Sequence, residues 1–268
     1  MTFETITYEV SDGVARLTLN RPDRMNGMTN QMVREACDAM IAANADQSIR
    51  VLVLTGNGNA FCPGADLGHF TSPSGDLSGK HEGGTDERLL PKHLRVATLL
   101  HEIHAVTIAA INGACAGAGL GWAAACDLRV ATARAKLNTA FLDVAVAGDM
   151  GLPWSLPRLV GAGKARELSF LPGKIDAEEA LRIGLVSRVF PDETFREETE
   201  AIVQRLAAAS PAALWGLKAS YLTAERTTFA DFIDLEAERH LRIAASDDTA
   251  EAFRAFMEKR PPRFSGEG

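Results

Sequence analysis

Small residues gather in one part of the sequence where the backbone itself could bind a ligand. An apolar run over residues 106–111 leads into Asn112-Gly113 and a small-residue stretch from Ala114 to Ala125. Small side chains let a ligand approach the main chain, and the first turn of a helix offers unpaired N–H groups and a positive dipole end. Such a junction could bind a phosphate or stabilise an oxyanion. Close packing of a helix against a sheet explains the same residues equally well, so both interpretations stay open.

Two glycine-rich segments do not follow the rules for nucleotide binding. In residues 117–121, Gly-Ala-Gly-Leu-Gly, the third glycine comes one residue too early for a dinucleotide fingerprint, and Trp122 stands in its place. Residues 161–164, Gly-Ala-Gly-Lys, lack both the earlier glycine and the following Ser or Thr of a P-loop. The sequence therefore predicts neither a dinucleotide site nor a nucleoside triphosphate site.

Asp149 is an acidic residue that stands among small and apolar neighbours. Gly148, Met150 and Gly151 surround it, and no cationic residue stands close by. If the carboxyl group is buried, desolvation raises its pKa and makes it a better base. The same residue could cap a helix predicted over 150–159, because Asp is a preferred N-cap, and the two roles are compatible. Asp143 is a second candidate, although an ion pair is its more ordinary function.

Histidine and cysteine residues complete the inventory of reactive side chains. His93, His101 and His104 lie near one face of a helix predicted over 87–104. They could supply a helper acid, but a partly exposed helix face is the more ordinary reason for such a set. No group of His, Asp and Glu has the spacing of metal ligands, so we expect no metal. The cysteines have no C-x-x-C spacing and stand among apolar residues, which favours reduced, buried thiols: Cys37, Cys62, Cys115 and Cys126.

The bulk composition limits the kinds of partner. The chain has 268 residues, is 46% hydrophobic and 24% charged, and carries a formal net charge of −7. This composition is typical of a globular protein, and the negative charge makes nucleic acid an unlikely partner. No apolar run reaches the roughly 20 residues of a membrane helix, and the N-terminus does not resemble a signal peptide. We therefore expect a soluble, cytoplasmic protein with no membrane partner.

The elements that must position these residues alternate between strands and helices over most of the chain. Strands predicted over 6–10 and 14–19 flank Asp12-Gly13, a strong hairpin signal. A helix over 30–43 and buried strands over 51–54, 106–111 and 128–131 follow. The polar segment 71–86 predicts a surface loop suited to a lid or a substrate entrance. The alternation predicts an α/β core.

The sequence becomes helical beyond Phe190. Helices are predicted over 192–209, 211–224, 229–246 and 247–259, and Asp or Pro residues mark two of the starts. We therefore predict a core over residues 1–190 and a helical region over residues 191–268. The helical region is suited to packing against the core or a neighbouring subunit.

The order of several short motifs resembles the crotonase superfamily of enoyl-CoA hydratases and isomerases. Each motif alone is weak, but the ordered set is specific and covers almost the whole chain. The matching segments are 19–22 (LNRP), 60–67 (AFCPGADL), 111–113 (ING), 117–119 (GAG), 126–127 (CD), 156–158 (LPR), 184–186 (GLV) and 256–260 (FMEKR) with Pro262 and Phe264.

The resemblance implies a crotonase-like spiral of ββα units with a C-terminal helical trimerisation region, assembled as a homotrimer or a dimer of trimers. It implies an acyl-CoA substrate, with coenzyme A as part of the substrate and no separate cofactor. The backbone N–H groups of Ala65 and Ala118 would form an oxyanion hole for the charge that develops on the thioester oxygen. The other residues that the resemblance assigns to substrate or CoA binding are Arg24, Met25, Gly64, Asp66, Leu67, Gly117, Phe141 and, reaching from a neighbouring subunit, Phe256 and Lys259.

The chain departs from the hydratases of this family at the two carboxylates that they use. Gly121 and Phe141 occupy those positions, whereas Asp149 matches the aspartate of isomerases and dehalogenases in the family. One carboxylate is enough for a 1,3-proton shift, since it can take a proton from one carbon and return it to another. We therefore predict isomerisation with Asp149 as the acid/base. Hydration, hydrolysis or dehalogenation with Asp149 as nucleophile, and acyl-CoA binding without catalysis are the alternatives.

Overall fold

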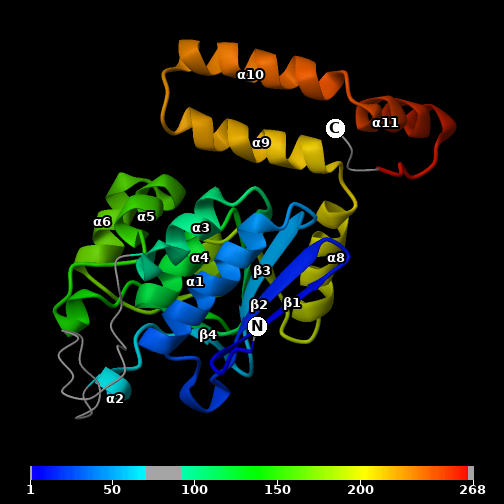
Figure 1. Cartoon of the computed structure of the whole chain (residues 1–268). Coiled ribbons are helices and arrows are strands. Elements are labelled where there is room, and N and C mark those ends of the chain that lie inside the picture. The colour runs from blue at the N-terminus through cyan, green and yellow to red at the C-terminus, as the bar shows by residue number, and fades with distance from the viewer. Residues whose placement is uncertain (1, 71–91, 265–268) are drawn as a thin grey trace.

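The computed structural model describes residues 2–70 and 92–264 (Figure 1). The surface loop predicted over 71–86 lies outside the described residues, as does the beginning of the helix predicted over 87–104. The described part of that helix consists of a 3-10 turn, His93–Arg95, and α3, Val96–Glu102. The prediction that this helix reaches His104 is wrong, because Ile103 has an extended ψ of 143° that ends the helix.

The larger sheet has six strands in the order β1-β2-β3-β5-β7-β10. β1 (Ile6–Ser11) and β2 (Val14–Leu19) form the predicted antiparallel hairpin, and Asp12 and Gly13 adopt the positive φ values of 52° and 75° that its tight turn requires. The remaining strands pair in parallel: β3 (Val51–Gly56), β5 (Val106–Ile111), β7 (Leu128–Thr132) and β10 (Arg188–Phe190).

A smaller sheet of four strands runs beside the first, in the order β4-β6-β8-β9. Its strands are β4 (Ala60–Cys62), β6 (Ala114–Ala116), β8 (Lys136–Asn138) and β9 (Ile175–Asp176). After each of β3, β5 and β7 the chain crosses directly from the large sheet into the small one. Each pass therefore contributes one strand to the large sheet and one to the small sheet. This arrangement is the predicted spiral of ββα units, and the fold prediction is confirmed.

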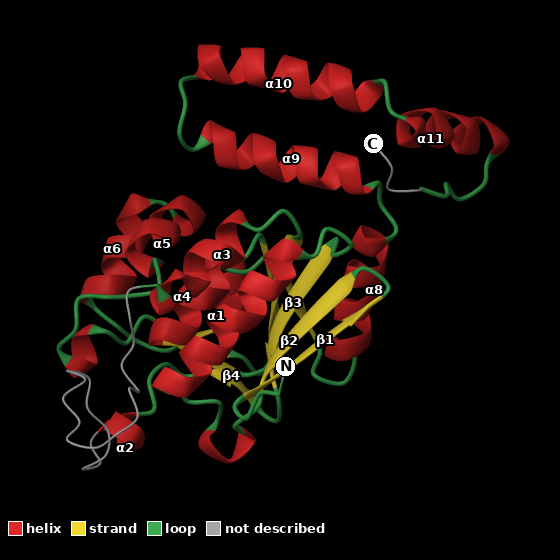
Figure 2. Ribbon diagram, in the orientation of Figure 1, coloured by secondary structure: helices red, strands yellow, loops and turns green. Residues whose placement is uncertain are grey.

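Helices fill the inner side of the spiral (Figure 2). α1 (Asn30–Ala45) begins where the Thr29 side chain accepts a hydrogen bond from the Met32 N–H at 3.2 Å. Its apolar residues recur at helical spacing and are buried, as expected for a helix that packs on a sheet. α4 (Gly117–Ala125) is buried at every position and contacts both sheets as well as α3. Because β6 ends at Ala116 and α4 begins at Gly117, the first turn of α4 directly follows a strand of the small sheet.

Shorter helices close the spiral after the small sheet. α5 (Leu152–Val160) packs against α4, and α6 (Ala162–Phe170) packs against α5. α7 (Ala177–Arg182) starts at Asp176, whose carboxylate accepts from the Glu179 N–H at 2.9 Å. The loop between β8 and α5 passes over the middle of α4, where Met150 and Asp149 lie against Gly121.

The C-terminal helices divide into one that covers the sheet and three that leave it. α8 (Phe195–Ala207) packs Val203 and Ala207 on the face of the large sheet opposite to α1. α9 (Pro211–Ala224), α10 (Phe229–Ala244) and α11 (Asp247–Glu258) extend away from the spiral (Figure 1). The packing therefore associates α8 with the core, and the extension begins at Pro211.

A buried lysine ties the extension to the core. Lys218 on α9 is only 6% exposed, and its Nζ donates to the Asp127 carboxylate at 2.7 Å and to the Ala105 carbonyl at 2.8 Å. In contrast, α10 has no buried residue in the single chain. Large apolar side chains remain exposed on α10 and α11: Phe229, Ile233, Leu235, Leu241, Phe253, Phe256 and Met257. Over the described residues, no helix has the length and apolar character to cross a membrane.

Candidate functional site

The turn after β4 presents a backbone N–H group that its neighbours leave unbonded. The Met28 N–H donates to the Gly64 carbonyl at 2.8 Å, and the Asp66 N–H donates to the Met28 carbonyl at 2.9 Å. These two bonds flank Ala65, so the N–H of Ala65 points away from Met28, as in any parallel bridge. Gly64 adopts a φ of 100°, a conformation that favours glycine, and this allows the turn.

A second N–H group stands at the start of α4. Ala116 is extended, Gly117 turns the chain with a φ of 51°, and Ala118 lies in the first helical turn, whose N–H groups have no partner inside the helix. The two turns touch, since a Cβ placed on Gly64 would lie 3.7 Å from the Ala118 nitrogen. Among the described residues, no hydrogen bond uses the N–H of Ala65 or Ala118. Two unbonded donors in adjacent turns can stabilise an oxyanion.

Close contact between α4 and β4 keeps these two turns together. A Cβ on Gly119 would lie 2.2 Å from the Cys62 carbonyl oxygen and 2.7 Å from the Cys62 Cβ. Only a glycine permits this approach, because any side chain at position 119 would separate the helix from the strand. Both interpretations of the small-residue stretch therefore apply. The close packing of α4 against β4 holds the N–H groups of Ala65 and Ala118 in adjacent turns.

The two loops predicted to line the CoA path lie side by side. Arg21 bonds the Asp66 carboxylate at 2.8 Å and also donates to the Gly27 carbonyl. A Cβ on Gly27 would lie 3.1 Å from the Cβ of Asp66 and 3.2 Å from the Arg24 carbonyl oxygen, so the turn that holds Arg24 packs against the Asp66 turn. The structure thus gathers the 24–25 turn and the 64–67 turn at one edge of the spiral. Met25 and Leu67 are exposed there.

Asp149 lies in an irregular segment that passes over α4. Its side chain is exposed in the single chain, yet enough protein surrounds the carboxyl group for desolvation to raise its pKa. The N-cap interpretation is wrong, because α5 begins at Leu152 with Gly151 at its N-cap position and no side-chain cap. Among the described residues, the Asp149 carboxylate has no hydrogen-bond or ion-pair partner. The carboxylate is therefore available for chemistry.

Gly121 and Phe141 border this segment. A Cβ on Gly121 would lie 2.7 Å from the Met150 Cβ, 3.1 Å from the Met150 carbonyl oxygen and 3.3 Å from the Asp149 carbonyl oxygen. Position 121 thus has no room for a carboxylate side chain. Phe141 lies within van der Waals contact of the space beside Gly117, at 3.9 Å, and beside Gly148, at 3.7 Å. Its ring forms a wall between the Gly117 turn and the Asp149 segment.

Comparison with known proteins identifies the class of this site. The family model described as enoyl-CoA hydratase/isomerase matches residues 9–267. The chain belongs to this family. It is an enzyme of the enoyl-CoA hydratase/isomerase family that acts on CoA thioesters.

Individual relatives of the enoyl-CoA hydratase/isomerase family align over the full chain. A protein of Rhodobacter capsulatus named probable enoyl-CoA hydratase is 36% identical, over 99% of this chain and 100% of its own. The 1,2-epoxyphenylacetyl-CoA isomerase of Escherichia coli is 34% identical, over 98% of this chain and 99% of its own. A crystal structure of a putative enoyl-CoA hydratase/isomerase from Mycobacterium abscessus superposes with a TM-score of 0.89 at 34% identity, covering 98% of this chain and 100% of that one.

Among the described residues, the other candidate side chains form no hydrogen bond or ion pair with Asp149. His101 pairs with Glu225 of α9 at 2.9 Å, and His104 donates to the Ile49 carbonyl at 3.1 Å. Burial lowers the pKa of His104, which favours its neutral form. Asp143 lies in a 3-10 turn, Leu142–Val144, and is exposed; among the described residues it forms no ion pair, so the ion pair expected for it stays a prediction.

Two residues assigned to CoA binding lie apart from the site in the single chain. Phe256 is 82% exposed on α11, and Lys259 ends that helix in a left-handed conformation. α11 stands at the far end of the extension from α2 (Leu67–Phe70), which follows the Ala65 turn (Figure 1). The interpretation that these residues serve a neighbouring subunit is compatible with this placement.

The sequence analysis missed the contribution of Arg21 and Met150. Arg21 stood in a recognised motif, but no local pattern pointed to its ion pair with Asp66, which joins residues 45 positions apart in the sequence. Met150 likewise had no local signal, because its contact with Gly121 joins residues 29 positions apart. Among the described residues, no group of three or more His, Cys, Asp or Glu side chains is placed to hold a metal ion.

Proposed function

We propose that this enzyme isomerises an acyl-CoA thioester, moving a double bond or rearranging a ring, with Asp149 as its single acid/base. The observation that carries this proposal is the contact over Gly121, where a Cβ would lie 2.7 Å from Met150. Phe141 stands at the other position where a hydratase of the family has a glutamate. Hydration needs both activation of water and protonation of carbon, which is usually the work of two positioned groups. Asp149 is left as the one matched acid.

The proposed oxyanion hole consists of the N–H groups of Ala65 and Ala118. Removing a proton from the thioester Cα or Cγ places negative charge on the carbonyl oxygen, and two preorganised donors lower that barrier by several kcal/mol, on the order of 3 for each donor. The Asp149 carboxylate accepts the proton from one carbon and returns it to another. Atoms and charge balance within this cycle, so no cofactor is required.

The electrostatics of Asp149 support its role as a base. Desolvation raises the pKa of its carboxyl group, and a stronger conjugate base removes a carbon-bound proton more readily. No cation approaches the carboxylate among the described residues to oppose that effect. The irregular loop that carries Asp149 passes over α4, the helix that supplies the N–H of Ala118.

Hydration is the second candidate function. The Asp149 side chain is exposed in the single chain, so a water molecule could reach it, and the Rhodobacter relative is named a probable hydratase. Hydrolysis or dehalogenation with Asp149 as the nucleophile, and acyl-CoA binding without catalysis, are the remaining alternatives. Isomerisation is favoured because it needs one carboxylate, and a relative at 34% identity is named an isomerase.

The rest of the proposal concerns CoA, assembly and location. CoA binding is assigned to the two neighbouring loops, through Arg24, Met25, Gly64, Asp66 and Leu67, with Gly117 and Phe141 beside the acyl group. Phe256 and Lys259 would reach the CoA of a neighbouring subunit in a homotrimer or a dimer of trimers. The exposed apolar side chains of α10 and α11 support such an assembly, since patches of this kind are typical of interfaces. We place the enzyme in the cytoplasm.

The reaction can be tested by product mass and structure. The protein is incubated with 3-enoyl-, 2-enoyl- and epoxidised aromatic acyl-CoA thioesters, and products are followed by mass spectrometry and NMR. A product of unchanged mass with a moved double bond or an altered ring supports isomerisation. A mass increase of one water identifies a hydratase and would replace the leading proposal.

The role of Asp149 is tested with a matched pair of variants. Asp149→Asn should lower kcat by about 100-fold or more, the usual effect of removing a general acid/base. Asp143→Asn is the control, because Asp143 is a nearby exposed aspartate without an ion pair in the described residues. Equal activity of Asp149→Asn and the wild-type enzyme would eliminate every catalytic role for this residue.

A further inference from the structure

Asp149 is held in a backbone segment of unusual conformation. The residue before it, Gly148, has a φ of 112°, and the two that follow, Met150 and Gly151, have φ values of 48° and 73°. Glycine adopts such values readily, but Met150 carries a Cβ and is strained in this region. A strained non-glycine residue persists only where its surroundings hold it, so the contacts of Met150 must stabilise the segment.

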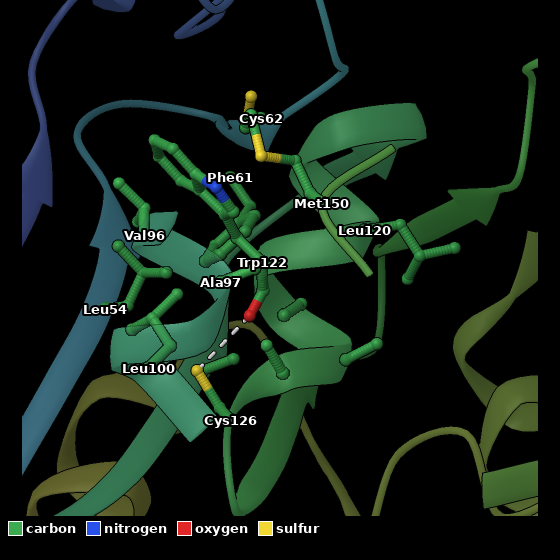
Figure 3. Close-up of a cluster of buried hydrophobic side chains, with 14 of the residues drawn as sticks. Leu54, Phe61, Cys62, Val96, Ala97, Leu100, Leu120, Trp122, Cys126 and Met150 are labelled. Carbon is green, nitrogen blue, oxygen red and sulfur yellow. Dashed lines mark hydrogen bonds between the residues drawn. The ribbon is translucent and has the colours of Figure 1, made fainter. Parts of the chain in front are cut away.

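The side chain of Met150 provides those contacts. Met150 is only 7% exposed and belongs to the main hydrophobic core, whereas Asp149 beside it is exposed. Figure 3 shows Met150 reaching into the cluster that contains Cys62 and Trp122, between β4 and α4. The methionine thus anchors the Asp149 loop to the two elements that carry the oxyanion donors.

Gly121 completes this anchor by the absence of a side chain. A Cβ on residue 121 would lie 2.7 Å from the Cβ of Met150, which is too short for two carbon atoms that are not bonded to each other. On the other side of Asp149, a Cβ on Gly148 would lie 2.8 Å from Pro153 Cγ, and the Leu152 N–H bonds the Asp149 carbonyl at 3.0 Å. The loop is therefore fixed on both sides of the aspartate.

We propose that Met150 is a positioning residue, which sets the Asp149 carboxylate at the reacting carbon by packing its side chain over Gly121. This inference rests on the proposed acid/base role of Asp149 and adds to it the residue pair that fixes the geometry. Met150 acts through Asp149 and not on the substrate. The reaction is sensitive to this geometry, because a proton is transferred efficiently only when donor and acceptor are held in line at hydrogen-bond distance.

The test measures proton abstraction directly, without knowledge of the natural acyl group. Hexanoyl-CoA and phenylacetyl-CoA are incubated with the full-length enzyme in D2O, and deuterium incorporation at Cα is followed by mass spectrometry. The Asp149 carboxylate removes a Cα proton, the resulting acid exchanges that proton with solvent, and a deuteron returns to the enolate carbon. The kcat and KM of this exchange separate the positioning of the base from the binding of CoA.

Truncation of the anchor should lower kcat and leave binding intact. Met150→Ala is expected to lower kcat by about 10- to 100-fold, the effect of a displacement near 1 Å at a reacting group, with little change in KM. The conservative variant Met150→Leu should recover most of that loss. Met40→Ala is the matched control, since Met40 is a fully buried methionine of α1 and its truncation should lower stability alone.

A second pair of variants tests the same contact from the helix side. Gly121→Ala places a methyl group in collision with the Met150 Cβ and should lower kcat as Met150→Ala does. Gly121→Ala combined with Met150→Gly removes the colliding Cβ together with the anchoring side chain, so its kcat should stay as low as that of Met150→Ala. Wild-type kcat in this double variant would show that the Met150 side chain does not position Asp149.

The outcomes separate this inference from the proposed function. If Asp149→Asn does not change the exchange rate, the acid/base role of Asp149 is wrong, and the inference about Met150 is wrong with it. If Asp149→Asn abolishes exchange but Met150→Ala and Gly121→Ala keep the wild-type kcat, the acid/base role stands and the positioning role is refuted. Parallel loss of kcat in Met150→Ala and Met40→Ala would also refute positioning.

Discussion

Replacing Gly119 with alanine is the most direct test of how the fold sets the proposed oxyanion hole. The new Cβ would lie 2.2 Å from the Cys62 carbonyl oxygen, whereas ordinary van der Waals contacts begin at 3.4 Å. The difference requires α4 and β4 to separate by about 1.2 Å at this point, since the obstructing atom belongs to the backbone and has no rotamer to change. Ala118 precedes the substitution directly, so its N–H moves with the helix.

The size of the effect follows from this displacement. Overpacking a well-packed core lowers the free energy of unfolding by about 1–3 kcal/mol. A displacement near 1 Å at a reacting group can lower the rate about 100-fold, and loss of one oxyanion donor has a similar effect. Gly119→Ala should therefore fold with a lower free energy of unfolding and lose most of its kcat. The loss of rate should exceed what the loss of stability explains.

The assay combines urea unfolding with deuterium exchange at Cα of hexanoyl-CoA. Gly163→Ala is the matched control, because Gly163 lies in the first turn of α6 with no atom within 4 Å of its Cβ position. Alanine favours the helix there, so this variant should be as active as the wild type and more stable by up to about 1 kcal/mol. Wild-type kcat in Gly119→Ala would show that the close approach of α4 to β4 does not control the donors.

Three further predictions follow from individual contacts. Because burial raises the pKa of Asp149, folding disfavours its carboxylate form, and Asp149→Asn should raise the free energy of unfolding at pH 7. In urea titrations this gain should shrink as the pH falls below the raised pKa of the folded state and vanish below the ordinary aspartate value of about 4. Lys218→Met removes the cation from the Asp127 carboxylate, which keeps the Thr107 N–H and hydroxyl as donors, and leaves the Ala105 carbonyl without the Lys218 donor; it should lower the free energy of unfolding by about 1–3 kcal/mol; a change below about 0.5 kcal/mol would contradict this. Leu241→Asp places a charge on the apolar face of α10 and should shift the sedimentation of the protein toward the monomer, with an unchanged circular dichroism spectrum; an unchanged oligomer would exclude that face from the interface.

The sequence predicted those helices and strands that are determined by residues close to them in the chain. The Asp12-Gly13 turn specified the first hairpin, and the apolar spacing of α1 predicted a helix over 30–43 that extends in the structure to Ala45. The helix predicted to end at His104 ends at Glu102 instead. The sequence did not predict this end, because no residue type between 102 and 104 marks a stop. The boundary there depends on how the chain enters β5, which is a tertiary constraint.

The candidate site was predictable in part, for a related physical reason. Its backbone donors follow from motifs at strand-to-helix junctions, so Ala65 and Ala118 could be assigned from sequence. The cap role considered for Asp149 depended on where α5 begins, and two residues with positive φ move that start to Leu152. The contact of Met150 with Gly121 joins two turns of the fold, and no local pattern contains it.

The order of strands in the large sheet has a consequence for how the enzyme folds and varies. β1, β2, β3, β5, β7 and β10 stand in the sheet in the order in which they are synthesised, so each new strand adds to the edge that the previous one left. The architecture is in this sense quasi-one-dimensional, as in repeat proteins, where each unit contacts mainly its neighbours. The Ala65 and Ala118 turns belong to successive units of the series, so their separation is a nearest-neighbour property. Insertions in loops distant from these two units can therefore change which acyl group is accepted. The distance between the N–H groups of Ala65 and Ala118 is not affected, because it depends only on the two neighbouring units that carry them.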